Sequence, residues 1–375
     1  MTDKTEVSIV RGGTSKGVYI LKKDLPEEIE ERDQRILKIF GSPDIRQIDG
    51  LGGADILTSK VAIISKSTDN NADIDYLFGQ VSIDTAYIDY KGNCGNISAG
   101  VGVYAIHKGL VAAMEPITTI RVRMVNTDKI LTIRVPVSER EPQALGNYKI
   151  DGVPGTGAKI SLDWSDFGGE RTGNILPTKN PLDTIEIEGK VYHISIIDAG
   201  NLVLFLEGTE LGLTGTESLS ELSENKELLL KLEKLRGVVC YKLGLSSSPN
   251  LAKKQSPLTP LVSLINQSCS YEAINGGKIL KQDTDVVSRV VVMGAFHKAH
   301  PVSGTIALGT ASRIDGTVVN NNCKNTTREV ISIGHPSGII EAKIRVTKKE
   351  KKFKLDEAEV YRTARVIMDG FVYTN

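Results

Sequence analysis

A single cysteine lies where strand-like sequence gives way to helical sequence. Residues 81–90 are rich in β-branched and aromatic side chains, which is typical of a strand, and residues 98–107 place apolar side chains at spacings that suit a buried helix. Cys94 therefore lies at a predicted helix N-terminus, where unpaired N–H groups and the helix dipole stabilise a thiolate. Such a thiolate can serve as a base or a nucleophile. The alternative is an inert side chain packed in a turn, but the glycines and asparagines that flank Cys94 favour the reactive interpretation.

A glycine-rich segment near the N-terminus could hold an anion. Residues 12–17 are Gly-Gly-Thr-Ser-Lys-Gly, so Ser15 and Lys16 lie in a turn whose backbone N–H groups can receive a carboxylate or a phosphate. The segment lacks the four-residue spacer of a P-loop, and residues 95–102 do not match the dinucleotide-binding fingerprint. We therefore expect no bound nucleotide, while the residues alone leave carboxylate and phosphate open.

The remaining cysteines and the paired histidines do not indicate a metal site. Cys240, Cys269 and Cys323 are scattered and form no C-x-x-C pair, which argues against a zinc knuckle and against a disulfide framework. His297 and His300 form an H-x-x-H pair, but no acidic residue lies beside them at the spacing of a metal ligand. We expect reduced thiols and no metal.

Composition places the chain among two-domain proteins that bind no nucleic acid. With 375 residues it exceeds the size at which one hydrophobic core stops growing. Lys plus Arg and Asp plus Glu balance at 46 each. The one basic run, residues 348–354, indicates a solvated turn or a strand edge rather than a patch that binds a partner. The N-terminus lacks the apolar core of a signal peptide, and no segment has the apolar length of a membrane span. We therefore expect a cytoplasmic protein without a membrane partner.

Short strands separated by few helices predict an α+β fold. The predicted strands cover residues 7–10, 61–65, 119–125, 130–137, 191–197, 286–293, 330–334 and 339–346. The predicted helices cover residues 26–40, 98–107, 219–235 and 306–314. Residues 246–257 have the composition of an exposed loop.

A faint internal repeat relates the two halves of the chain. In the first half, residues 11–15 follow a strand and residues 92–100 open a helix; in the second half, residues 196–201 and 302–305 occupy comparable places. Two similar domains facing one cleft would bring both helix N-termini to a small anion. The second helix would begin at Ser303, Gly304 and Thr305, whose hydroxyl and N–H groups could act as donors.

Several motifs, taken together and in this order, resemble the PrpF family. The motifs cover residues 11–17, 52–61, 92–96, 198–201, 297–305 and 334–338, and the resemblance continues to residues 362–365. It implies a diaminopimelate epimerase-like fold with two pseudo-symmetric domains, each a curled sheet around a central helix, and an active site between them. On this basis we divide the chain into residues 1–186, to which 356–375 return, and residues 187–355.

The resemblance also implies the chemistry. The family includes 2-methylaconitate cis-trans isomerase, 3-methylitaconate Δ-isomerase and 4-oxalomesaconate tautomerase, which act without a cofactor on small unsaturated acids such as these or aconitate. Allylic proton removal and return require a base, an acid and anion stabilisation. Lys60 and Cys94 resemble the family's catalytic pair, provided that burial favours the neutral amine of Lys60. The residues that would bind the substrate carboxylates are Ser15, Lys16, Gly95, Asn96, His297, Ser303, Gly304 and Thr305, with His335 and Ser337 in a further glycine-flanked turn.

Departures from the family pattern leave the substrate open. Amino acid epimerases of this fold use a cysteine from each domain, but residues 303–305 contain no thiol, so two-cysteine racemisation is not expected. Asn201 is followed by Leu202 where the family pattern has proline, and residues 298–301 also differ from it.

Two functions other than isomerisation are also compatible with parts of the sequence. A non-catalytic accessory protein would keep the carboxylate site but would need neither Lys60 nor Cys94. A cysteine hydrolase would use Cys94 as nucleophile and His297 as base, but no orienting acid or amide motif accompanies that pair. The sequence leaves the oligomeric state open, with a homo-oligomer as one option.

Overall fold

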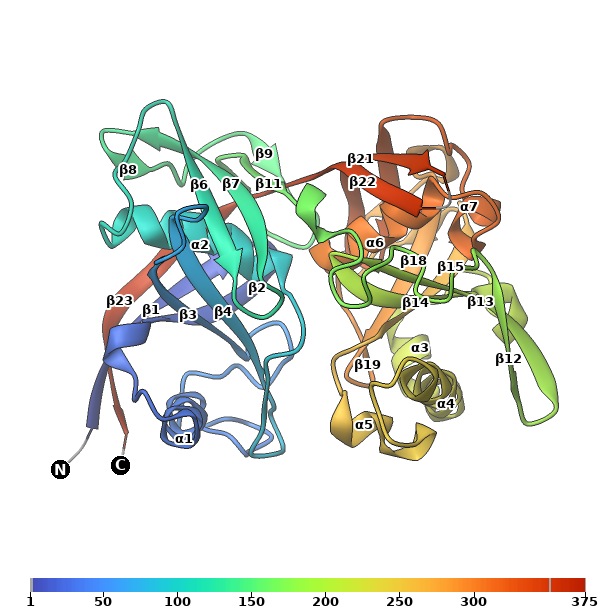
Figure 1. Cartoon of the computed structure of the whole chain (residues 1–375), viewed down its shortest axis with the longest axis horizontal. Coiled ribbons are helices and arrows are strands. Elements are labelled where there is room, and N and C mark those ends of the chain that lie inside the picture. Colours follow the sequence, from blue (N-terminus) through green and yellow to red (C-terminus); the bar gives the residue numbers. More distant parts are fainter. Residues whose placement is uncertain (1–2, 351, 375) are drawn as a thin grey trace. The chain divides into compact units, whose positions relative to one another are not determined.

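The computed structural model describes residues 3–350 and 352–374, which form two compact units (Figure 1). Unit 1 contains the residues up to Asp163 and those from Tyr361 onward, and unit 2 runs from Trp164 to Val360. The first division therefore lies earlier than the 186/187 boundary drawn from the sequence. The reason is that Trp164 and Phe167 are fully buried and bonded within unit 2, where Trp164 N donates to Ala358 O and Phe167 O accepts from Gly200 N.

Unit 1 is a strongly curled mixed sheet. Its main strands lie in the order β23, β1, β2, β3, β4, β6, β7, β11, and neighbours are antiparallel except for the parallel pairs β2/β3 and β4/β6. Their bounds are β1 (Asp3–Gly12), β2 (Ser15–Leu21), β3 (Lys60–Lys66), β4 (Ile74–Val81), β6 (Ile117–Met124), β7 (Lys129–Ser138), β11 (Ile160–Asp163) and β23 (Ala364–Thr374). Short strands are β5 (Ile88–Asp89), β8 (Glu141–Pro142), β9 (Tyr148–Lys149) and β10 (Thr156–Gly157).

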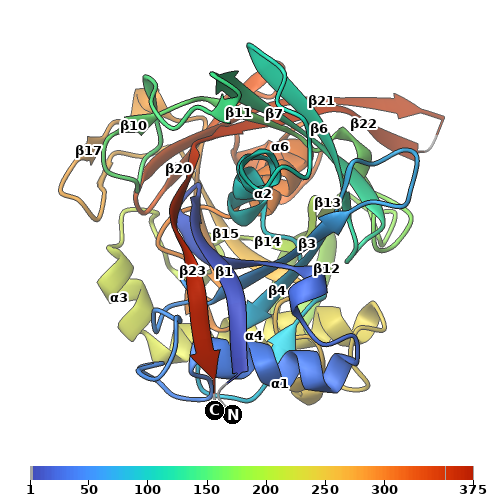
Figure 2. The ribbon, with the colours of Figure 1, turned by 90° about the vertical axis from the view of Figure 1, so that its left-hand side faces the viewer.

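The helix α2 (Gly95–His107) runs through the middle of this curled sheet (Figure 2). It contacts β1, β2, β3, β7, β11 and β23, and all its residues from Gly95 to Ile106 are buried. Glycines allow the close approach: a Cβ at Gly100 would lie 2.3 Å from Tyr19 Oη. The helix α1 (Ile29–Phe40) packs Ile36, Ile39 and Phe40 against the other face of the sheet.

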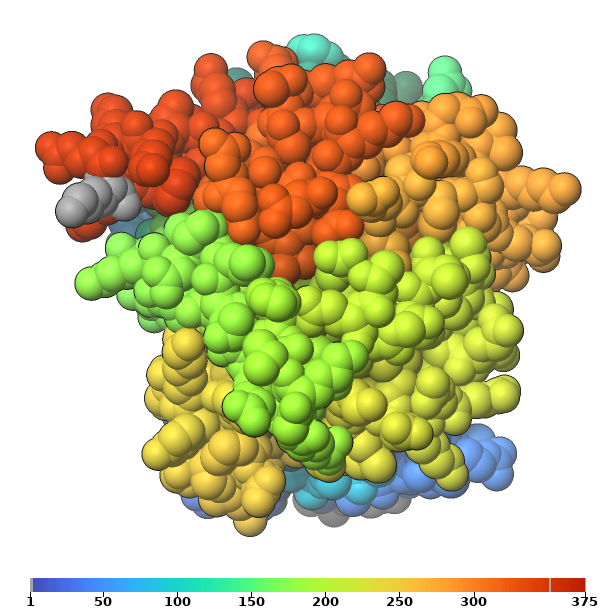
Figure 3. All heavy atoms as spheres, turned by 90° about the vertical axis from the view of Figure 1, so that its right-hand side faces the viewer, coloured from blue at the N-terminus to red at the C-terminus, as the bar shows by residue number. Residues whose placement is uncertain are grey.

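Unit 2 repeats this topology. Its sheet has the same succession of antiparallel and parallel pairs, in the strand order β12, β13, β14, β15, β18, β20, β21, β22. The buried helix α6 (Val302–Ser312) takes the place of α2. The bounds are β12 (Asp183–Ile187), β13 (Lys190–Ala199), β14 (Asn201–Glu207), β15 (Leu261–Gln267), β18 (Val286–Val292), β20 (Val330–His335), β21 (Gly338–Lys349) and β22 (Lys352–Arg362). In Figure 3, which faces unit 2, the segment 164–190 (green) lies beside the strands at the unit's C-terminal end (red).

The smaller elements complete both units. In unit 1 these include the 3₁₀ turn η1 (Lys22–Asp24). In unit 2 the short strands are β16 (Tyr271–Glu272), β17 (Lys278–Ile279) and β19 (Ala295–Phe296), the helices are α3 (Leu219–Glu224), α4 (Lys226–Lys242), α5 (Ala252–Gln255) and α7 (Val318–Asn322), and the 3₁₀ turns are η2 (Ser165–Phe167), η3 (Gly208–Leu211), η4 (Pro249–Leu251) and η5 (Lys281–Asp283). In the part of the chain that the structure describes, no helix combines the length and the apolar character that crossing a membrane requires.

The α+β class and the curled sheet around a central helix are confirmed, and three local predictions are wrong. Residues 246–257, predicted as a loop, contain η4 and α5. Residues 81–90 are not one strand: only Ile88–Asp89 pairs with β4 after the chain bends through a turn closed by Ser82 N and Tyr87 O, 3.0 Å apart. The single helix predicted over 219–235 is two helices, α3 and α4, because the Asn225 side chain caps a new helix by accepting from Leu228 N.

A cluster at the C-terminal end of α2 ties β23 to the helix. Asp369 accepts hydrogen bonds from Ser8, from His107 Nε2 at 2.6 Å and from Lys108 Nζ at 3.0 Å. Burial alone would raise the pKa of Asp369, but these hydrogen bonds and the Lys108 charge hold that pKa well below its usual range.

Asp369→Asn is expected to lower the free energy of unfolding by about 1 kcal/mol at pH 7, a modest figure because the carboxylate is partly exposed. A carboxylate whose pKa is depressed by folding stabilises above its unfolded pKa, about 4, and this contribution is lost as the pH falls below that value. Urea unfolding of wild type and variant should therefore give curves that converge between pH 7 and pH 3. Asp49→Asn, at an exposed carboxylate, is the control with no expected change, and a gap that stays constant with pH would contradict the assignment.

Candidate active site

The glycine-rich turn between β1 and β2 is fixed by its neighbours in unit 1. Gly13 adopts a φ of 51°, which favours glycine, and its N–H donates to Thr363 O at 2.9 Å. Arg11 Nη1 donates to Thr363 O at 2.8 Å and to Gly13 O at 3.1 Å. The turn is thus held against the segment that leads into β23.

The same turn packs directly on the first residues of α2. A Cβ at Gly12 would lie 2.2 Å from Asn96 O, so the turn and the helix touch through backbone atoms. Asn96 Oδ1 accepts from Thr14 N at 3.4 Å and from Arg362 Nε at 3.1 Å. Arg362 is buried, and burial lowers the pKa of its guanidinium to about 10. Its hydrogen bonds go to neutral oxygens, Asn96 Oδ1 and Tyr361 O.

Two hydroxyls at this junction lack a partner within the described residues. Thr14 Oγ1 and Ser15 Oγ are both buried and neither makes a hydrogen bond there. The N-cap of α2 is Cys94, whose side chain makes no capping hydrogen bond to the first turn. Unpaired buried hydroxyls beside an uncapped helix N-terminus form an arrangement suited to an anion.

Cys94 is partly exposed and lies beside two buried tyrosines. Its carbonyl accepts from both Ser98 N and Ser98 Oγ at 2.9 Å, which fixes the start of the helix. Burial first, and the nearby Cys94 charge second, raise the pKa of Tyr19 and of Tyr76 well above the usual value. Both phenols therefore stay protonated and add no charge near Cys94.

Lys60 is a buried amine at the start of β3. Its Nζ donates to Gln80 Oε1 at 2.6 Å and lies 5.4 Å from the centre of the Phe78 ring, and it forms no ion pair with any described residue. A Cβ at Gly17 would lie 2.9 Å from Lys60 O and 3.0 Å from Ile97 Cδ1, so Lys60 sits next to the first turn of α2. The structure therefore brings Lys60, the Cys94 end of α2 and the glycine-rich turn together.

The predicted residues of unit 2 gather at the start of α6. This helix also lacks a side-chain cap, and Asn201 Nδ2 donates to Ser303 Oγ at 3.4 Å across from the β13/β14 turn. Gly304 lies in the first turn of α6, where a Cβ would meet no atom closer than 3.6 Å. His297 is buried, and its Nδ1 accepts from Ala299 N at 3.1 Å, so the neutral ring carries its proton on Nε2.

Thr305 supports a second histidine. Its hydroxyl donates to Pro301 O at 3.0 Å and so accepts from His300 Nδ1 at 2.8 Å, while His300 Nε2 lies 3.0 Å from Ser288 Oγ. His300 thus belongs to a polar network beneath the helix start. Its ring and that of His335 lie with centres 6.4 Å apart, and His335 Nδ1 accepts from Ser337 N at 3.2 Å.

Three features of the site were not predicted from the sequence: Gln80, the hydrogen bond that Arg362 donates to Asn96, and the unpaired Thr14 hydroxyl. Gln80 could have been found only from the cross-strand register, because β4 pairs with β3 so that Gln80 faces Lys60. Within the described chain, no three His, Cys, Asp or Glu side chains are grouped in a way that could hold a metal ion.

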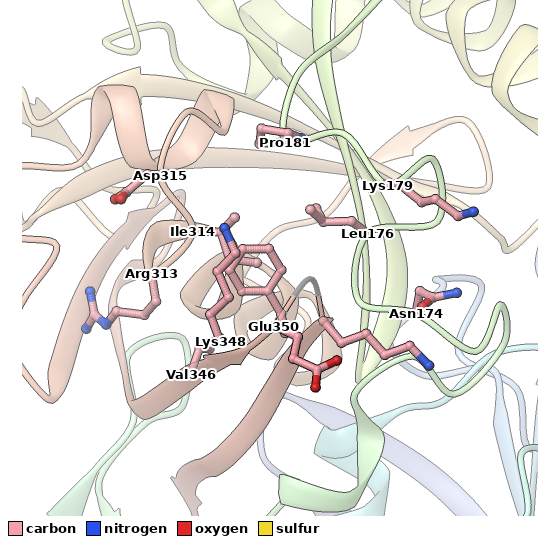
Figure 4. Close-up of a pocket in the computed structure, with 12 residues that line it drawn as sticks. Asn174, Leu176, Lys179, Pro181, Arg313, Ile314, Asp315, Val346, Lys348 and Glu350 are labelled. Atoms are coloured by element: carbon pink, nitrogen blue, oxygen red, sulfur yellow. The ribbon is translucent and has the colours of Figure 1, made fainter.

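Two hollows in the structure include none of the predicted site residues. One of about 700 Å³ in unit 2 is lined by Lys179, Lys348 and Glu350 among others (Figure 4). Arg313, at its border, points away from the other labelled side chains, and its Nη1 donates to Ser312 Oγ at 3.1 Å. Another of about 900 Å³ in unit 1 lies between residues 22–27 and the outer face of β3 and β4.

Comparison with protein families decides the assignment. A family model described as PrpF protein matches residues 2–375. The chain belongs to the PrpF family. The structure of a methylitaconate-delta-isomerase superposes with a TM-score of 0.81 at 42% identity and covers 100% of this chain and 96% of its own. A hydroxyproline epimerase from Agrobacterium vitis, at 10% identity and a TM-score of 0.60 over 99% of this chain and 93% of its own, shares the fold alone.

Three relatives of this chain are named as isomerases or as a tautomerase. The 3-methylitaconate isomerase of Eubacterium barkeri is 43% identical and covers 100% of this chain and 98% of its own length. The 2-methyl-aconitate isomerase of Shewanella oneidensis is 35% identical (98% and 96%), and the 4-oxalomesaconate tautomerase of Pseudomonas putida is 37% identical (97% and 94%). The predicted PrpF family, epimerase-like fold and isomerase class are confirmed, and no observation supports the accessory protein.

Proposed function

We propose that this PrpF protein is a cofactor-independent isomerase of a small unsaturated di- or tricarboxylate of the methylitaconate, methylaconitate, oxalomesaconate or aconitate type. The observation that carries the proposal is Lys60, a buried amine with no ion pair among the described residues, beside the helix N-terminus that begins at Cys94. A protein that only bound carboxylates would need positive charge and N–H donors at this helix start. It would need neither a thiol nor a buried amine that is hydrogen-bonded to a neutral amide.

The reaction needs one proton to leave and one to return. Removal of an allylic proton leaves a dienolate whose negative charge extends over the conjugated carboxylate. When a proton returns at another carbon, the double bond shifts. Return at the same carbon, after rotation in the delocalised intermediate, interchanges cis and trans. We assign these two transfers to Lys60 and Cys94. The uncapped N–H groups at the start of α2 stabilise the charge that develops on the substrate carboxylate.

The remaining residues hold the carboxylates. In unit 1, the Ser15 hydroxyl and the backbone N–H groups of Gly95 and Asn96 act as donors, and the Lys16 ammonium adds charge. In unit 2, we assign the same task to His297 and to the uncapped start of α6 at residues 303–305. Because the Thr305 hydroxyl is already bonded to Pro301 O and His300, that residue contributes by holding His300 in place.

Proton NMR in deuterium oxide tests the proposal. The purified protein is incubated with each of methylitaconate, 2-methylaconitate, oxalomesaconate and aconitate, and the vinyl and methylene signals are followed. We expect conversion of at least one acid with deuterium entering the carbon that is reprotonated. Measurable binding of these acids without conversion or exchange would overturn the assignment.

We further propose that the enzyme works in the cytoplasm. All four cysteines are free in the structure, and a thiol that transfers protons must stay reduced.

A further inference from the structure

The side chain of Gln80 has a fixed orientation beside Lys60. Its Nε2 donates to Ser59 O at 2.9 Å and to Ile56 O at 3.2 Å, and it is 2% exposed. Since both carbonyl oxygens can only accept, the amide must turn its NH₂ group toward them. Its Oε1 therefore has to face Lys60 Nζ, 2.6 Å away.

Gln80 also lies between Lys60 and an acidic residue two strands away in the sheet. Gln80 on β4 pairs with Lys60 on β3 on one side and with Asp89 on β5 on the other. Asp89 is fully buried, and its Oδ1 accepts a hydrogen bond from Lys91 N at 2.7 Å. The Phe78 ring lies on the same strand as Gln80, with its centre 5.4 Å from Lys60 Nζ, and α2 packs against β3. A carboxylate thus lies two strands away, and the position next to the amine is taken by a neutral amide.

The same amide connects the amine to the glycine-rich turn. Gln80 Nε2 holds the loop before β3 through Ile56 O and Ser59 O, and the intervening Leu57 O accepts from Lys16 N at 2.9 Å. A displacement of Gln80 would therefore move both Lys60 and the backbone next to Lys16.

The corresponding position in unit 2 carries no amine. There β15 begins at Leu261 directly after Pro260, in the place that Lys60 and β3 occupy in unit 1. The amine and its amide partner are thus a property of one half of the repeat, where the Cys94 thiol also lies.

We propose that Gln80 is a positioning residue of the isomerisation: it holds the Lys60 amine through a neutral oxygen of fixed orientation, and so leaves Lys60 free to take up a proton from substrate. This inference rests on the proposed function, in which Lys60 and Cys94 transfer the protons, and it adds that Lys60 is the residue that removes the proton. A carboxylate at the same place would pair with the ammonium form and keep Lys60 protonated, which removes a base. A neutral acceptor orients the amine without that charge.

The test compares Gln80→Glu with Gln80→Met. Both variants lose the hydrogen bonds to Ser59 O and Ile56 O, but only Gln80→Glu adds charge, so the second is the matched control. We expect both to lower kcat. Only Gln80→Glu should move the acid limb of the kcat/KM profile to higher pH, by one unit or more, which is at least tenfold in rate on that limb. A Gln47→Glu variant places a buried carboxylate among Ser42, Ala54 and Ser59, to which the Gln47 amide is hydrogen-bonded, and should leave the limb in place.

A second readout does not depend on turnover. The Cε signals of ¹³C-labelled lysine are titrated in wild type, Gln80→Glu and Gln80→Met, and the Lys60 signal is assigned by its loss in Lys60→Met. A shift of this titration to higher pH in Gln80→Glu alone supports the inference even if none of the tested acids is converted, in which case the proposed function fails separately. Equal losses of kcat in both variants, with unmoved limbs and unmoved Lys60 titrations, would show that Gln80 is only structural and overturn the inference.

Discussion

Lys60→Met and Cys94→Ser are each expected to lower kcat for isomerisation about 100- to 10,000-fold, the range that a positioned acid or base contributes. Methionine keeps the buried aliphatic length of Lys60 but cannot accept a proton, and a serine hydroxyl at the start of α2 is far less acidic than a thiol. Initial rates at saturating substrate give the effect on kcat, and thermal unfolding shows whether the fold is kept.

The two variants should differ in proton exchange with solvent. If one residue removes the allylic proton and the other returns it at a different carbon, the variant that keeps the first still exchanges that proton in deuterium oxide without converting the acid. Proton NMR of the recovered substrate therefore identifies the base. Loss of exchange in both variants would mean that Lys60 and Cys94 act on the same step.

Matched substitutions test whether these losses are specific. Lys66→Met changes an exposed lysine at the far end of the same strand, β3, and Cys323→Ser changes another partly exposed free thiol in unit 2. Both should keep kcat within about twofold, because distant surface changes have small effects. Isomerisation that survives in Lys60→Met at the rate of Lys66→Met would contradict the assignment of Lys60.

The start of α2 could be predicted from the sequence because the signal there is local. A strand-like run, a glycine- and asparagine-rich turn and an apolar helical run place Cys94 at a helix N-terminus, and the structure has it as the N-cap. The helix begins at Gly95 rather than Ser98, since burial inside the curled sheet outweighs the low helix propensity of Gly95 and Asn96.

Other features depend on contacts between distant residues. The Lys60–Gln80 pair joins residues whose proximity follows only from the register of β3 with β4, which no spacing in the sequence reveals. Residues 15–17 belong both to the glycine-rich segment and to the strand β2, so the turn signal concealed the start of the strand. At 82–87 the β-branched content resembles a strand, but the hydrogen bond from Ser82 N to Tyr87 O closes a turn instead.

Gly12→Ala is expected to displace the glycine-rich turn from the helix that it touches. The added Cβ would lie 2.2 Å from Asn96 O and 3.2 Å from Gly100 N, both backbone atoms of a fully buried helix that cannot yield. Overpacking of this kind costs about 1–3 kcal/mol of unfolding free energy. The shift also moves the Ser15 hydroxyl away from the N–H groups of α2, so we expect KM for the carboxylate substrate to rise at least about tenfold. Urea unfolding and initial rates measure the two effects.

The decisive comparison is with a glycine that has room. Gly304→Ala adds the same methyl group in the first turn of α6, where the nearest atom lies 3.6 Å away, and alanine there should leave the unfolding free energy unchanged or raise it by up to about 1 kcal/mol. Equal stability of the two variants would mean that the turn and α2 do not meet through backbone atoms. A Gly12→Ala protein that is destabilised but keeps its KM would instead show that the packing of the turn does not affect carboxylate binding. The start of α2 alone would then bind the carboxylate.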